Sequence, residues 1–219
     1  MGNPDLIVVL DSGGPSYEHI WVTEALRGLV AGNLSVRVSH EGVHSGMSGG
    51  AIPSSFRIQR MLLDRVENSK TGEVLIPEMH VQISEKIKRE AVALGEILGD
   101  ELWTSLPVVN TLEAQSKESS EMLLDINWRP ALSIIGADGI PPVQTAGNVL
   151  RTNTDLKLSF RIPPGVKADE VQEILKQVLE ENPPYGAEVT YKPTEPADGF
   201  HAPPLHLSLI HISEPTRPY

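Results

Sequence analysis

Two stretches with a strict alternation of apolar and polar residues constrain the fold of this chain most strongly. In the first stretch, Leu34, Val36 and Val38 alternate with polar residues. In the second, Leu156 and Phe160 lie on either side of Leu158, with polar residues between them. A period of two residues is that of a β-strand with one buried side. The sequence therefore predicts at least two strands of a sheet that has one buried face.

Three helices are predicted around these strands. Pro53 suits the first turn of a helix that would bury Phe56 and Leu62. A second helix is predicted to begin near Ser84, where apolar residues follow at helical spacing. A third is predicted after residue 168, because Asp169 and Gln172 form a capping-box pattern that precedes a periodic apolar run.

Further strands are predicted at residues 131–136 and 187–191, so the order is β-α-(extra helix)-β-β-α-β. This order predicts an α+β fold, with an antiparallel four-stranded sheet and helices on one face. The run Leu6–Leu10 is different, because it is continuously apolar and β-branched, as in strands buried on both faces. We therefore expect residues 1–26 to be the remnant of an α/β domain that begins upstream.

The composition excludes several classes of partner. The chain has 18 Lys and Arg residues against 29 Asp and Glu, a formal charge of −11, which argues against nucleic acid and against an anionic membrane. Cysteine is absent, which excludes disulfides and thiolate metal sites. Because the first residues also lack the basic start of a signal peptide, we expect a cytoplasmic protein.

One stretch matches a metalloprotease motif. His40-Glu41-Gly42-Val43-His44 fits H-E-x-x-H, in which two histidines four apart on a helix bind one zinc ion. The residues before it alternate as in a strand, and Gly42 lies within it, so a helix there would be poorly supported. A zincin-like protease built on these residues is one alternative, and it requires a helix at His40.

The same stretch also resembles another family when several motifs are read together. The chain resembles the di-zinc exopeptidases of peptidase family M20, which include carnosinases, aminoacylases and succinyl-diaminopimelate desuccinylases. The resemblance runs from Asp5 to Pro204 and is carried by five segments in the expected order: Asp5–Gly13, Val43–Pro53, Trp128–Ser133, Gly147–Leu150 and Leu158–Pro164. Several ordered motifs are far more specific than a single short pattern.

The resemblance implies a role for four residues. Asp11 corresponds to a carboxylate ligand of one zinc ion, and His44 to a histidine that stabilises the oxyanion in the partner subunit's active site. Arg161 corresponds to a clamp on the substrate carboxylate. Asn148 corresponds to a polar substrate contact, although Arg151 stands where the family usually has proline. Without the resemblance, these residues would be read as turn or surface residues.

The resemblance also implies what the whole enzyme does. It would hold two zinc ions per subunit, form a homodimer through the lid domain, and cleave amide bonds in dipeptide-like or N-acyl amino acid substrates. The remaining zinc ligands and the general base are absent from this sequence, so we expect the chain to be inactive alone and not to bind zinc tightly. The other alternative is a stand-alone dimerisation or binding module.

These inferences divide the chain into four parts. Residues 1–26 are expected to be a remnant of the catalytic domain, and residues 27–192 to form the dimerisation (lid) domain. Residues 193–206, rich in proline, would return toward the catalytic domain. Residues 207–219 resemble a translated sequencing adapter, so we expect them to make no contribution to the fold.

Overall fold

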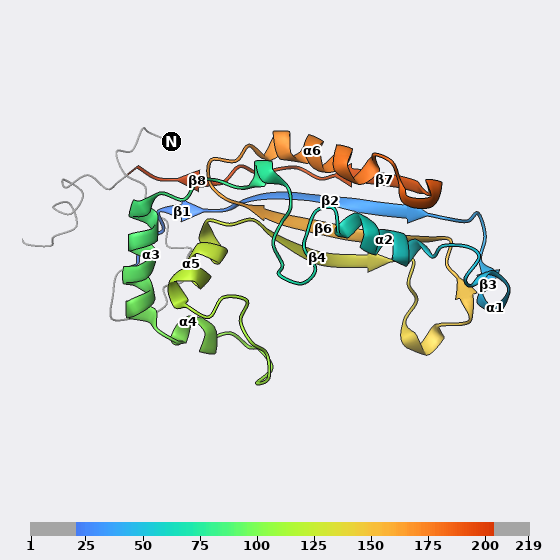
Figure 1. Ribbon diagram of the computed structural model, residues 1–219, viewed down its shortest axis with the longest axis horizontal. Coiled ribbons are helices and arrows are strands. Elements are labelled where there is room, and N and C mark those ends of the chain that lie inside the picture. Colours follow the sequence, from blue (N-terminus) through green and yellow to red (C-terminus); the bar gives the residue numbers. More distant parts are fainter. Residues whose placement is uncertain (1–20, 204–219) are drawn as a thin grey trace, which may run out of the picture.

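A four-stranded antiparallel sheet lies at the centre of the protein (Figure 1). The computed structural model describes residues 21–203. The strand order is β4-β6-β2-β7, and the strands are β2 (Gly28–Arg37), β4 (Ala131–Asp138), β6 (Asn153–Ile162) and β7 (Glu188–Pro193). The predicted α+β class and its antiparallel four-stranded sheet are confirmed. The segment read as a remnant of an α/β domain lies mostly outside the described residues.

Two helices cover one face of this sheet. Helix α2 (Ser55–Leu63) packs on β2 and β6, and α6 (Ala168–Glu180) packs on β2 and β7. The alternation along β6 explains this, since Leu156, Leu158 and Phe160 are buried under the helices while the residues between them face away. Burying each such side chain stabilises the fold by about 1.5–3 kcal/mol. The opposite face carries polar side chains of β2 and β6, and no helix of residues 21–203 packs on it.

Two of the local predictions for these helices were wrong. Phe56 is 47% exposed, because α2 turns Ile58, Gln59 and Leu62 toward the sheet instead. The capping box predicted for α6 is not formed. Instead, the carboxylate of Asp198, thirty residues further along the chain, accepts a hydrogen bond from the backbone N–H of Ala168 at 2.8 Å.

A second helical unit lies beyond one end of the sheet (Figure 1). Helix α3 (Glu85–Leu98) begins after its cap Ser84, near the predicted start, and packs against α5 (Ser119–Asn127). The short α4 (Glu101–Thr104) lies between them in sequence. The two helices approach closely at Gly95, where a Cβ atom would lie 2.9 Å from the backbone nitrogen of Ser120. The extra helix predicted from the sequence is therefore α3, and it forms a packed pair with α5.

Two short strand pairs mark the two ends of the sheet. At the end near α3, β1 (Ala25–Leu26) pairs with β8 (Phe200–His201). At the other end, β3 (Val43–His44) pairs with β5 (Val149–Leu150). The remaining elements are short: α1 (Ser45–Ser48) and the 3-10 turns η1 (Pro77–Met79), η2 (Val143–Thr145) and η3 (Pro184–Gly186). No helix within residues 21–203 is long and apolar enough to cross a membrane.

Candidate functional site

An exposed turn presents His44 at the end of the sheet where β2 finishes and β6 starts. His44 is the last residue of β3 and lies opposite Val149 of β5. Its carbonyl oxygen accepts a hydrogen bond from the hydroxyl of Ser48 at 3.1 Å, which fixes the turn that follows. The side chain itself is exposed.

The backbone of this turn sets the tautomer of His44. The N–H of Gly46 donates to Nδ1 of His44 at 3.1 Å, so Nδ1 is the acceptor and the proton of the neutral ring resides on Nε2. Glycine suits position 46, because a Cβ there would lie 3.1 Å from Nδ1 and Cε1 of the ring. The turn thus leaves one N–H donor, at Nε2, facing outward.

Asn148 lies next to the His44 turn, one residue before β5. Its carbonyl oxygen accepts a hydrogen bond from the N–H of Ser45 at 2.9 Å. Its side chain is exposed and makes no hydrogen bond to any residue in the range 21–203. A backbone contact therefore holds this residue, and the amide group remains available for another molecule.

The zincin arrangement is not formed. Residues His40–Gly42 are irregular backbone after β2, and His44 belongs to strand β3. The motif requires both histidines on one face of a helix, which this backbone does not provide. His40 instead lines a separate small pocket with Tyr185 and Glu188.

Arg161 lies at the opposite end of the sheet from His44. It is the next-to-last residue of β6 and pairs with Leu29 of β2 and Ala131 of β4. Its side chain is exposed, and no hydrogen bond or ion pair to it is found among the described residues. Eight residues separate it from Asn153 at the start of β6, which corresponds to about 27 Å along the strand. One copy of the chain therefore cannot bring His44 and Arg161 to the same small substrate.

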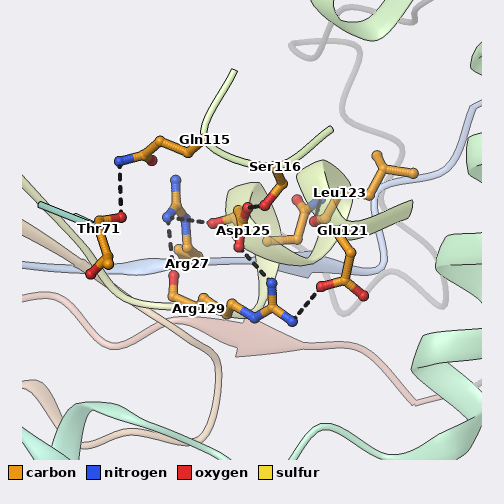
Figure 2. Close-up of polar contacts among 9 residues, drawn as sticks. Arg27, Thr71, Gln115, Ser116, Glu121, Leu123, Asp125 and Arg129 are labelled. Carbon is orange, nitrogen blue, oxygen red and sulfur yellow. Dashed lines mark hydrogen bonds and ion pairs between the residues drawn. The ribbon is translucent and has the colours of Figure 1, made fainter. Parts of the chain in front are cut away.

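A network of charged residues joins helix α5 to the start of β2 (Figure 2). Arg129 forms ion pairs of 2.7 Å with both Asp125 and Glu121. Arg27 donates from Nη1 to the carbonyl oxygens of Asp125 and Arg129, at 3.2 Å each. These contacts tie helix α5 to the junction between β1 and β2.

Electrostatics differ between the two arginines. Burial, together with repulsion from Arg161, lowers the pKa of Arg27, while Asp125 opposes this shift. Burial alone would also lower the pKa of Arg129, but hydrogen bonds to Asp125 and Glu121 outweigh it and raise the pKa. Sequence reasoning did not identify Arg27, because its partners lie about a hundred residues away and no local pattern points to them.

No metal centre is built from the described residues. Among residues 21–203, no group of three or more His, Asp or Glu side chains could hold a metal ion. Asp11, the predicted zinc ligand, lies outside the described residues. The residues that the structure describes therefore do not fit a catalytic zinc site by themselves.

The sequence model of the M20 peptidase dimerisation domain matches residues 25–187. The chain belongs to this family. The family assignment confirms the resemblance found in the motifs. It makes the chain a relative of hydrolases that are metallopeptidases. A comparison with curated proteins finds no match.

Solved structures of M20 enzymes share the fold of this family member. Human carnosine dipeptidase 1 superposes with a TM-score of 0.70 at 20% identity, over 86% of this chain and 40% of that one. The dipeptidase Dug1p from Saccharomyces cerevisiae gives 0.66 at 19% identity, over 84% and 39%. The metallo-carboxypeptidase Sso-CP2 from Sulfolobus solfataricus gives 0.61 at 17%, over 78% and 39%. The chain thus spans about two fifths of the length of these relatives, and the likeness concerns the fold.

Proposed function

We propose that this chain provides the dimerisation (lid) domain, residues 27–192, of a zinc-dependent hydrolase that cleaves amide bonds in dipeptide-like or N-acyl amino acid substrates. The family assignment supports the domain, and the motifs around His44, Asn148 and Arg161 support the substrate class. Two zinc ions, one of them bound by Asp11, would polarise the amide carbonyl and activate water in the complete enzyme. The roles below concern only side chains of the lid.

His44 is the proposed oxyanion donor. Its Nε2–H is the available donor, because Nδ1 accepts from the N–H of Gly46 and the side chain is exposed. An oriented N–H donor aimed at developing negative charge is among the larger catalytic terms. Arg161 is the proposed clamp on the substrate carboxylate, and its planar guanidinium with no partner among the described residues suits that role. Asn148 would supply a further polar contact.

The observation that carries the proposal is the separation of His44 from Arg161 at opposite ends of the sheet. In a homodimer with a two-fold axis, two edge strands pair antiparallel and every strand of the partner runs the other way. The joined sheet would then have the start of β6 from one copy and the end of β6 from the other copy on the same side. His44 would meet the partner's Arg161, and a complete substrate site would need both copies.

Strand β4 is the edge best suited to this pairing. Ile134 is 45% exposed and Ile135 is 58% exposed, so this edge presents apolar side chains to solvent. The other edge strand, β7, carries Glu188 and Lys192 and ends in proline, features that protect an edge from pairing. Two β4 strands side by side would place the two β6 strands about 14 Å apart.

The interface is tested with the 219-residue chain. Ile135→Lys should convert a dimer into a monomer in light scattering, because a charge would then face the apolar edge of its partner. Lys192→Glu, on β7, is the matched control and should leave the dimer intact. If the dimer is lost in the control but not in the Ile135 variant, β7 forms the interface instead of β4.

The catalytic role is tested by complementation in the complete enzyme. His44→Ala should lower kcat by about a hundredfold or more, the scale for removal of one oxyanion donor. Mixing His44→Ala subunits with Asp11→Ala subunits should restore activity, because one cleft of a mixed dimer combines intact zinc ligands with the partner's intact His44. If mixed dimers are confirmed by mass and no activity returns, His44 does not act across the interface. Full activity of His44→Ala would show that His44 has no role in the hydrolysis.

A further inference from the structure

A pocket of about 570 Å³ lies where helix α5, the segment of residues 71–83 and the start of β4 meet. This volume lies within the range of about 300–1,000 Å³ that is usual for small-molecule sites. Its polar lining includes Arg27, Glu73, His80, Gln115 and Ser116. None of these residues belongs to the set that the motifs pointed to, so the pocket needs a separate explanation.

Arg27 lines this pocket, and its Nε and Nη2 donors are not used by the described residues. Only Nη1 is engaged, by the carbonyl oxygens of Asp125 and Arg129. Nε and Nη2 make no hydrogen bond within residues 21–203. Figure 2 shows the end of the Arg27 side chain pointing into the space between Gln115 and Ser116.

The neighbouring carboxylate does not neutralise Arg27 by direct contact. Oδ2 of Asp125 accepts a hydrogen bond from the Ser116 hydroxyl at 2.5 Å, and Oδ1 accepts one from Arg129 at 2.7 Å. Both carboxylate oxygens are therefore committed elsewhere (Figure 2). Burial, and then repulsion from the nearby positive charge of Arg161, lower the pKa of Arg27. A half-buried cation in this position gains from a bound anion.

The free edge of Arg27 specifies the shape of that anion. Nε–H and Nη2–H of a guanidinium point in parallel and match the two oxygens of a carboxylate. Glu73 lines the same pocket, and its carboxylate has no hydrogen bond or ion pair among the described residues. A positive group on the ligand could pair with it.

We propose that this pocket binds a small zwitterion, an amino acid or a dipeptide, with its carboxylate on the Nε–Nη2 edge of Arg27 and its ammonium group facing Glu73. The site is a binding site of the lid itself. It does not depend on the proposed amide hydrolysis, and its test uses no enzyme activity.

The test is an NMR titration of the isotope-labelled 219-residue chain, observing the Arg27 Nε–H signal. The probes are L-alanine, L-alanyl-L-alanine, propionate, which lacks the ammonium group, and L-alaninamide, which lacks the carboxylate. L-alanine or the dipeptide should shift the signal saturably, propionate should bind more weakly, and L-alaninamide should have no effect. Whichever of the first two binds more tightly defines the size of the ligand. No saturable shift with either of them overturns the proposal.

Variants separate the two charges. Arg27→Met should weaken L-alanine binding by about tenfold to a hundredfold, the scale for losing hydrogen bonds to a charged group. Glu73→Gln, at an exposed position that does not endanger the fold, should reduce the affinity for L-alanine to the affinity for propionate. Arg151→Met, near β5 at the other end of the sheet, is the matched control and should bind normally. Unchanged binding in Arg27→Met or in Glu73→Gln contradicts the assignment, and if Arg27→Met does not fold, Arg27→Lys serves in its place.

Discussion

The two ends of the central sheet hold their exposed side chains in different ways. At the His44 end, a short turn is fixed by backbone contacts such as the one from Ser45 to Asn148, and most side chains are exposed. At the Arg27 end, ion pairs join α5 to the sheet, and two chain segments touch backbone to backbone at Gly28 and Gly199.

This difference is informative about how each end can change. The His44 turn has few packed neighbours, so its residues can serve another molecule without cost to the core. The Arg27 end is more constrained, because ion pairs and long-range hydrogen bonds hold α5 to the sheet, and the close approach at Gly28 involves backbone on both sides. Substitutions should therefore be tolerated at the first end and be destabilising at the second.

The largest effect is expected from Gly28→Ala. A Cβ at Gly28 would lie 2.4 Å from the carbonyl oxygen of Ala197 and 2.6 Å from the nitrogen of Gly199, so β2 and the segment before β8 must separate. We expect a loss of about 3 kcal/mol in the free energy of unfolding, measured with urea. Gly147→Ala at the His44 end, where nothing lies within 4 Å, is the control and should change it by less than about 0.5 kcal/mol. Equal losses of unfolding free energy in the two variants would show that the two ends tolerate substitution equally.

A smaller effect is expected from Asp125→Ala. The substitution removes the acceptor of Ser116 and Arg129, while leaving the carbonyl contact to Arg27 in place. A loss of about 1–2 kcal/mol should follow, together with faster hydrogen exchange of the backbone amides of α5. Glu118→Ala, at the start of the same helix but without a side-chain cap contact, should show neither change.

Gly46→Ala sharpens the comparison from the His44 side. The added methyl group would crowd the imidazole at 3.1 Å, so the ring must shift and its bond from the Gly46 N–H must weaken. Stability should change by less than about 1 kcal/mol, because the turn is exposed. The ¹⁵N chemical shifts of His44 should reveal a larger share of the other tautomer. Unchanged shifts would mean that Gly46 does not select the tautomer.

The smallest effect concerns pH and Asp198. The hydrogen bond from Lys167, and then that from the Ala168 N–H, lower the pKa of this carboxyl group below its ordinary value of 3.8. Since the folded pKa is the lower one, the stabilisation is present above the unfolded value and is lost as pH falls through the folded value. Asp198→Asn should therefore show a shallower decline in unfolding free energy between about pH 5 and pH 2. A decline as steep as that of the original chain would contradict this role.

The fold was predictable where local pattern and burial agree. Leu156, Leu158 and Phe160 alternate and are buried under helices, and α3 begins directly after Ser84, near which its start was predicted. The start of β2 was missed, because Ala31 and Gly32 break the alternation. Ala31 is buried beside residue 194, and Gly32 leaves room for the ring of Tyr191, because a Cβ atom at position 32 would lie 2.5 Å from that ring. Such contacts depend on chain segments about 160 residues away and leave no local trace.

The candidate site was predictable only in part, for a related reason. His44 and Asn148 belong to motifs, and the structure brings them together. Their roles, like that of Arg161, remain predictions. Arg27 has no motif, since its surroundings are assembled from α5 and the loop of residues 71–83. Phe56 was misplaced because the sequence does not reveal that a polar residue, Gln59, takes the buried position by donating to the carbonyl oxygens of Leu34 and Thr154.

The pairing of β1 with β8 has a consequence for protein engineering. Ala25 lies opposite His201, so the entrance and exit of a stretch of more than 170 residues are neighbours in space. A unit with adjacent ends can replace a surface loop of an unrelated host with little loss of loop-closure entropy. Residues 25–201 therefore form a cassette that could be grafted onto another scaffold, where exposure of its β4 edge would make association of the host controllable through a single residue such as Ile135.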